Sequence, residues 1–179
     1  MTKWWLVVAA VMTFVRIADA AESGHPRTID LQMTCDARVP ASVLEQSQDE
    51  VTRIFAGAGL AVRWTDTTPR FTVHVVAQVL GYSTAGSPVM GVAMRNTKGS
   101  TARVFFKQVQ DFARVHRVDL GSVLGYVIAH EVGHLLLPGN AHSPTGLMQA
   151  QWDKALVHNA ARGSLTFTEV QAARIRASR

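Results

Sequence analysis

Two histidines with a glutamate between them are the residues of this chain best suited to chemistry. His130 and His134 are four positions apart, and Glu131 directly follows the first. The run from Leu120 to Leu137 is a predicted helix, on which a spacing of four puts both imidazoles on one face, about one turn apart. Zinc favours nitrogen ligands in a tetrahedral shell, so the pair predicts two ligands of one zinc ion. Glu131 borders the same site in a position that suits a general base rather than a ligand.

A catalytic zinc site also needs a third protein ligand and an open fourth position for water. Pro138 cannot continue the helix, and Gly139 permits a sharp turn, so the chain can double back after Leu137. His142 follows three residues past that glycine. We therefore expect His142 to be the third ligand, delivered from a loop rather than from the helix.

The histidines belong to a longer pattern of nineteen residues. It reads His130-Glu131-x-x-His134, then Gly139-x-x-His142-Ser143, then Gly146-Leu147-Met148. This pattern resembles the zinc-binding region of the metzincin metallopeptidases, and its His-Ser pair is closest to the matrixin-like branch. The resemblance implies that the three histidines bind zinc and that Glu131 is the catalytic base. It also implies that Gly139 forms the turn before the last ligand and that Met148 lies in a tight turn beneath the zinc.

The spacing departs from that family pattern by two residues. The family places the glycine three positions and the last histidine six positions after the second histidine, whereas here the offsets are five and eight. Zinc peptidases of a different clan take a glutamate on a later helix as their third ligand, so Glu169 stays an alternative to His142. Asp153 and His158 are weaker alternatives. Met148 could equally be a core methionine that fills a gap.

Together these residues predict hydrolysis of peptide bonds by a zinc-dependent endopeptidase. Zinc lowers the pKa of a water molecule from about 16 toward ~7, and Glu131 accepts its proton and returns it to the leaving amine. By resemblance, an edge strand at Val89–Met94 or Ala102–Phe106 holds a peptide or protein substrate in extended form. Two alternatives stay open: a secreted zinc-binding or interaction module without turnover, and a zinc amidohydrolase that acts on cell-wall peptides.

Strands are predicted on both sides of a first long helix. Alternating or β-branched apolar residues indicate them at Thr28–Thr34, Leu60–Trp64, Phe71–Val79, Val89–Met94 and Ala102–Val109.

Three helices are predicted from their end signals. The first opens with a capping box at Ser42 and Glu45 and stops at Gly57 and Gly59. The second is the helix of the two histidines, with Asp119 as its cap. The third starts near Thr166 with a capping box to Glu169 and continues to Ala177. The order of elements predicts an α+β, zincin-like fold: a mixed four- to five-stranded sheet with a long N-terminal helix, an active-site helix and a C-terminal helix.

Composition limits the remaining possibilities. The chain has 179 residues, 47% of them hydrophobic, which excludes a wholly disordered protein. A single cysteine, Cys35, excludes an intramolecular disulfide framework. The net charge is +5, but the basic residues are scattered and not interleaved with aromatic ones, so nucleic acid is not an expected partner. The oligomeric state is left open.

The first twenty residues are typical of a secretory signal peptide. Lys3 precedes an apolar run from Trp4 to Val15, and Ala18-Asp19-Ala20 is a small-x-small site, so cleavage is expected after Ala20. An uncleaved anchor is the alternative. Residues 21–179 are then a single zincin-like metallopeptidase domain, secreted or periplasmic. They contain no apolar run near the ~20 residues that span a bilayer, so no stable membrane span is expected after processing.

Overall fold

The computed structural model describes residues 26–77, 89–96, 99–137, 139, 141–152 and 154–178. The predicted signal peptide (residues 1–20) lies outside the described residues, as do Pro138 and Asp153. In the part of the chain that is described, no helix has the length and apolar character needed to cross a membrane.

The fold is α+β with a mixed five-stranded sheet, as predicted. The elements follow one another as β1 (Arg27–Cys35), α1 (Ala41–Gly57), β2 (Leu60–Trp64), β3 (Phe71–Val76), β4 (Gly91–Asn96), β5 (Gly99–Phe105), α2 (Phe106–His116), α3 (Leu120–Leu136), α4 (Lys154–Ala161) and α5 (Glu169–Ala177). The strand order is β2-β1-β3-β5-β4. The pairs β1–β2, β1–β3 and β3–β5 are parallel, whereas β4 runs antiparallel to β5 at one edge of the sheet.

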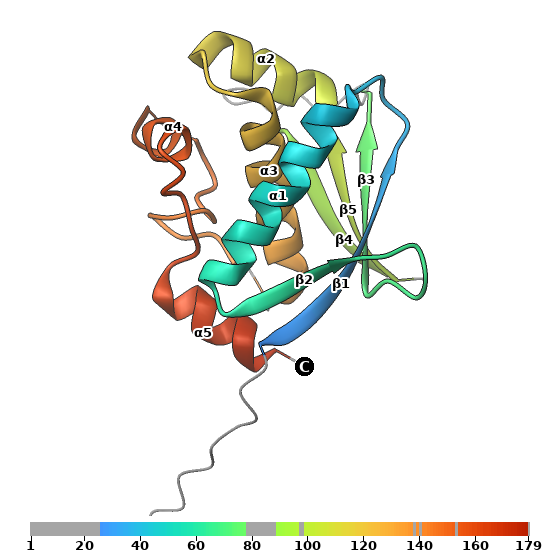
Figure 1. Ribbon diagram of the computed structural model, residues 1–179. Coiled ribbons are helices and arrows are strands. Elements are labelled where there is room, and N and C mark those ends of the chain that lie inside the picture. The colour runs from blue at the N-terminus through green and yellow to red at the C-terminus, as the bar shows by residue number, and fades with distance from the viewer. Residues whose placement is uncertain are drawn as a thin grey trace, which may run out of the picture.

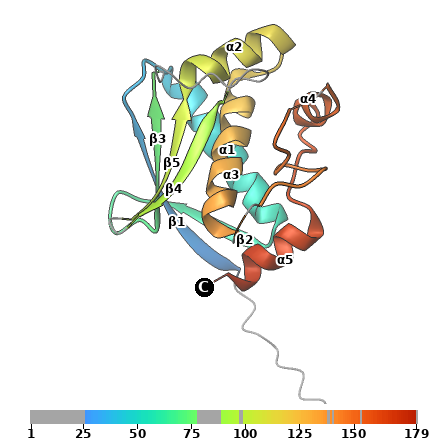
Figure 2. The same ribbon diagram turned by 180° about the vertical axis from the view of Figure 1, so that it is seen from behind.

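The helices α1 and α3 lie together on one face of the sheet (Figures 1 and 2). The strand residues that face them are fully buried, among them Ile29, Val73 and Val104. On α1 the buried residues include Ile54 and Phe55. The core therefore lies between the sheet and this helix pair, and α3 runs through it.

Close packing against α1 fixes the position of α3. A Cβ atom on Gly125 of α3 would lie 2.9 Å from the carbonyl oxygen of Ser47 and 2.6 Å from Cβ of Glu50, which real side chains do not tolerate. Glycine at this position thus lets the two helices approach closely. At the start of α3, the Asp119 side chain accepts a hydrogen bond from the Ser122 N–H at 2.7 Å, which confirms the predicted cap.

Both predicted capping boxes were wrong. Helix α1 begins at Ala41 with Pro40 as its N-cap and has no side-chain cap, so Ser42 and Glu45 lie inside the helix. At the C-terminal helix, the carbonyl of Thr166 accepts a hydrogen bond from the Leu147 N–H at 2.8 Å. That bond ties Thr166 to another segment of the chain, and the N-cap is Thr168, so the helix begins at Glu169.

Two helices were missed. The pattern from Ala102 to Val109 predicted one strand, but β5 ends at Phe105 and α2 begins directly after it. The buried residues of α2 are Phe106, Val109 and Ala113, which have helical spacing. The first two of them also lie within the apolar pattern that predicted the strand. Helix α4 is only eight residues long. The first helix stop was predicted correctly, since α1 ends at Gly57 and Gly59 has φ +79°.

Candidate metal centre

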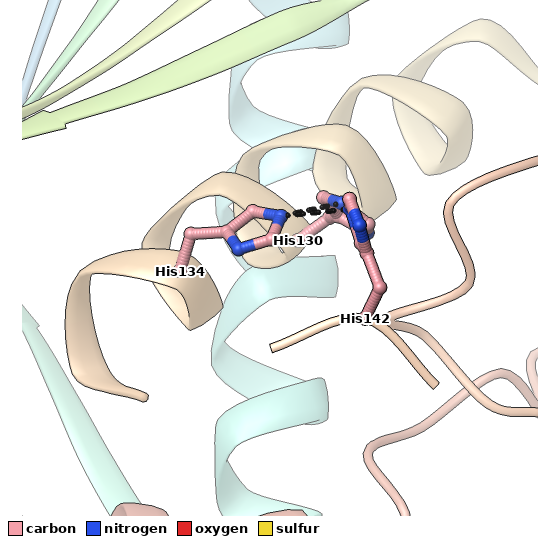
Figure 3. Close-up of side chains that lie close together, drawn as sticks. All are labelled: His130, His134 and His142. Atoms are coloured by element: carbon pink, nitrogen blue, oxygen red, sulfur yellow. Dashed lines mark hydrogen bonds between the residues drawn. The ribbon is translucent and has the colours of Figure 1, made fainter. Parts of the chain in front are cut away.

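Helix α3 carries the first two histidines on one face. His130 and His134 are one helical turn apart, and their Nε2 atoms are 3.1 Å from each other. His130 is buried, whereas His134 is partly accessible. Both side chains point from α3 into the same space (Figure 3).

A turn after α3 brings the third histidine back to the same space. The helix ends at Leu136, Leu137 is extended, and Gly139 adopts φ +67°, in the left-handed region that favours glycine. His142 then approaches from the loop, with its Nε2 atom 3.2 Å from that of His134 (Figure 3). The candidate ligand atoms of the three rings all lie within 4.8 Å of one another. The three histidines are therefore close enough to bind one metal ion.

The spacing of these nitrogens fits a metal ion. At metal–nitrogen distances of about 2.0–2.1 Å, a tetrahedral ion holds its ligand nitrogens roughly 3.3 Å apart. The two Nε2 separations that involve His134 are 3.1 and 3.2 Å. A hydrogen on His134 Nε2 could serve only one of these two contacts, whereas one cation would serve both.

A backbone carbonyl sets the tautomer of His130. Its Nδ1 atom lies 2.8 Å from the carbonyl oxygen of Leu147, which can only accept, so Nδ1–H is the donor. In the neutral ring the Nε2 atom then carries a lone pair directed at the other two histidines. Such a bond to the second nitrogen is typical of histidines that bind metals.

Burial favours the neutral form of the two helix histidines. Burial and, to a smaller extent, the neighbouring His134 and His142 lower the pKa of His130 to about 4, although the hydrogen bond to Leu147 acts to raise it. Burial and the proximity of His142 likewise lower the pKa of His134 to about 4. Neutral imidazole is the form that binds a metal ion, so the environment keeps both rings ready for it.

Glu131 is buried beside the histidines and against strand β4. Its side chain is 6% exposed, and burial raises its pKa to about 8. A Cβ atom on Gly91 of β4 would lie 2.7 Å from Cγ and 2.8 Å from Oε1 of Glu131. The bare backbone of Gly91 thus leaves the space that the carboxylate occupies.

A turn at Gly146–Gln149 lies under the histidine helix. Gly146 has φ +78°, and the Met148 carbonyl accepts a hydrogen bond from the Ser143 N–H at 2.9 Å. Met148 is fully buried, and its sulfur would lie 2.7 Å from a Cβ atom placed on Gly133 of α3. Met148 is therefore a core residue as well as the methionine of a tight turn close to the site.

Replacement of Met148 by alanine is expected to destabilise the protein by about 2–5 kcal/mol, because it leaves a cavity under α3. Urea unfolding measures the change. Met94 is the matched control, because it lies on β4 with 38% of its surface exposed. Met94→Ala should change the free energy of unfolding by no more than about 0.5 kcal/mol. Equal effects of the two substitutions would contradict the placement of Met148 in the core.

The histidines and Glu131 open into a cleft of about 1170 Å³ between α3 and strand β4. Val92 and Ala93 of β4 form one wall, and Phe112 and Trp152 form part of the other. Arg95 of β4 donates a hydrogen bond to the carbonyl of Leu135, which ties the strand to the end of α3. Of the two strand segments expected to border the site, β4 lies at the sheet edge, whereas β5 is enclosed between β3 and β4.

The alternative third ligands lie elsewhere, as far as the described residues show. The Glu169 side chain is 85% exposed, and its carboxylate accepts a hydrogen bond from Arg176 at 2.9 Å. His158 lies on α4 and contacts Arg162 at 3.4 Å. Among the residues that the structure describes, the group able to share a metal ion consists of the three histidines.

Two residues that contact the site or its loop were not predicted from the sequence: Gly91 packs against Glu131, and Gln171 donates hydrogen bonds to Ala141 and Ser143 on either side of His142. Gly91 lies 40 residues before Glu131 in the sequence, and Gln171 lies 29 residues after His142. Nothing local distinguishes Gly91 from an ordinary glycine at a strand end. The place of Gln171 at the start of the C-terminal helix does have a local signal, because Thr168 and Gln171 form a capping box that overlaps the predicted one at Thr166 and Glu169.

The fold and the site define an α+β protein with a three-histidine candidate metal centre at the edge of a mixed sheet. No model of a known protein family matches the chain, and no curated protein matches it in sequence. Assignment of the centre therefore rests on the geometry of its own residues.

Proposed function

We propose that the protein is a zinc-dependent endopeptidase of metzincin type, close to the matrixin-like branch, and that it acts outside the cytoplasm. The observation that carries this proposal is the convergence of His130, His134 and His142 beside a buried Glu131. This group faces an open cleft along an edge strand. The signal-like residues 1–20 support a secreted or periplasmic location.

Zinc fits the donor set best. Three imidazoles with no thiolate match a catalytic site of three protein ligands and an open position, although imidazole also suits copper, nickel and iron. When bound, zinc polarises a carbonyl group and lowers the pKa of water from 15.7 to about 7.

Glu131 is the residue proposed to move protons. Burial raises the pKa of Glu131 to about 8, and the charge of a bound zinc ion would favour the ionised form against that burial. The carboxylate would then take a proton from the attacking water and later give one to the leaving amine. The surrounding burial keeps bulk water away from this carboxylate, and Gly91 keeps room for it. A site that bound zinc for structural reasons alone would not need a carboxylate there and would tend to fill the fourth position. This argument favours an enzyme over a non-catalytic zinc module.

Strand β4 is proposed to bind the substrate backbone. It pairs with β5 on one side, and its residues Val92 and Ala93 line the cleft. A peptide in extended form could add to this edge by main-chain hydrogen bonds, which would lay it along the histidines. This mode of binding suits a peptide or protein substrate, because it uses the main chain of the substrate.

The direct test is cleavage of casein by purified protein, with zinc content measured by elemental analysis. We expect one zinc ion per chain and cleavage that stops with a chelator and returns with zinc. Zinc binding without cleavage of casein or of a broad peptide library would favour the non-catalytic module. Cleavage confined to cell-wall peptides would instead favour the amidohydrolase.

Gly91→Ala tests the fit between β4 and Glu131. The added Cβ atom must displace the Glu131 side chain or the strand. Displacements of about 1 Å at an active site can cost 10²-fold in rate, so we expect kcat/KM to fall by roughly 10- to 100-fold. Zinc content should not change, because the histidines are not touched. Gly57→Ala is the matched control, since a Cβ atom there meets nothing within 4 Å. An unaffected kcat/KM in Gly91→Ala would contradict the assigned role of Glu131.

A further inference from the structure

Gln171 of helix α5 faces the loop that carries His142. Its side chain is buried, with 6% exposed. The Nε2 group donates hydrogen bonds to the carbonyl of Ala141 at 3.3 Å and to the hydroxyl oxygen of Ser143 at 2.9 Å. These two residues flank His142 on either side. One amide from the C-terminal helix thus holds both neighbours of the third histidine.

The hydrogen-bond partners define which way the amide points. The oxygen of Gln171 accepts from the Thr168 N–H at 3.0 Å, and a nitrogen there would face another donor. The Ser143 hydroxyl donates to the carbonyl of Thr145 at 2.7 Å, so its lone pairs are available to accept from Gln171. Each of these hydrogen bonds has one donor and one acceptor. The clamp, defined as Gln171 with its bonds to Ala141 and Ser143, is therefore consistent as a whole.

The three histidines differ in how their backbones are fixed. His130 and His134 lie within α3, whereas His142 lies in the loop after Gly139 and is exposed. A loop that is not held must lose conformational freedom when its histidine binds a metal ion, and this loss lowers the affinity. A loop held in place beforehand has less freedom to lose.

We propose that Gln171 is a positioning residue that holds His142 in its binding position, so that helix α5 sets the metal affinity of a centre built on α3. This inference rests on the metal centre of the proposed function but not on peptide hydrolysis. It assigns the C-terminal helix a role beyond packing. Removal of contacts that orient metal ligands commonly costs 10- to 100-fold in affinity, and a loss of that size is expected here.

Gln171→Glu is the decisive variant. A carboxylate keeps the acceptor for the Thr168 N–H, and so keeps the helix cap, but it has no hydrogen to donate to Ala141 or Ser143. Competition with a chromophoric zinc chelator should show a dissociation constant for zinc about 10- to 100-fold higher than that of the parent. With Co²⁺ in place of zinc, the visible absorption bands should shift or weaken, because they report the ligand set directly.

Thr168→Ala separates the clamp from the stability of α5. It removes the hydroxyl that accepts a hydrogen bond from the backbone N–H of Gln171 at 3.3 Å. It leaves in place the hydrogen bonds from the Gln171 side chain to the loop. We expect a lower melting temperature, as for loss of an N-cap, with zinc affinity within about twofold of the parent. A similar loss of affinity in Thr168→Ala would show that helix stability, and not the clamp, is responsible.

Ser143→Ala provides a second route should Gln171→Glu fail to fold. It removes one of the two acceptors of the clamp, so zinc affinity should fall by about 2- to 10-fold. Parent-like affinity and cobalt spectra in whichever of these two variants folds would overturn the inference. A parent protein that takes up no metal would overturn both this inference and the proposed function. A parent that binds zinc yet cleaves nothing would overturn the peptidase alone.

Discussion

Glu131→Gln is expected to retain one zinc ion per chain and to lower kcat/KM for peptide cleavage by about 10²–10⁴-fold, the usual contribution of a positioned acid–base group. Glutamine has nearly the same shape, so it can fill the space beside Gly91, but it cannot accept a proton from water. Glu131→Ala should lose hydrolysis in the same way. Both variants should fold, because burial raises the pKa of Glu131 to about 8, and the substitution replaces a group whose charged form that burial disfavours.

Glu169→Gln is the matched control for this experiment. It makes the same chemical change at an exposed position on α5, where the carboxylate contacts Arg176. Zinc content and cleavage should equal those of the parent, and a loss of zinc would restore Glu169 as a ligand. If Glu131→Gln cleaves peptides as fast as the parent, the proposed mechanism is wrong. If it loses zinc, Glu131 is a ligand rather than a base.

The helix that carries the two histidines could be predicted because its signals are local. Asp119 marks its start, and a spacing of four puts His130 and His134 on one face of any helix. The turn at Gly139 is also local, and it was enough to predict that His142 would return to the site.

The rest of the site depends on contacts between segments far apart in the chain. Gly91 matters because β4 is the edge strand that packs on Glu131, and no local pattern gives the strand order. The capping box at Thr166 was wrong for a similar reason, because the Thr166 carbonyl is engaged by Leu147 from the turn under α3. Helix α2 was missed because Phe106 ends one apolar pattern and begins another.

His142→Ala should lower zinc affinity and activity together. The apparent binding free energy of four-ligand structural zinc sites is about 10–16 kcal/mol, so one ligand accounts for roughly 2.5–4 kcal/mol, or two to three orders of magnitude in affinity. Because His142 is exposed, the metal-free variant should be as stable as the metal-free parent, within about 0.5 kcal/mol. Loss of His134 should cost at least as much affinity, because its nitrogen lies close to both other rings.

The effect of zinc on unfolding makes this prediction quantitative. At a free zinc concentration of 1,000 times the dissociation constant, the parent should gain about 4.1 kcal/mol in free energy of unfolding. With affinity lowered by 10²–10³-fold, His142→Ala should gain only about 0.4–1.4 kcal/mol at the same concentration. His158→Ala is the control, because His158 lies on α4 and contacts Arg162 rather than the centre. If His142→Ala keeps the zinc occupancy of the parent and the same zinc-dependent gain in free energy of unfolding, the loop histidine is not a ligand. The geometry on which the peptidase proposal depends would then be wrong.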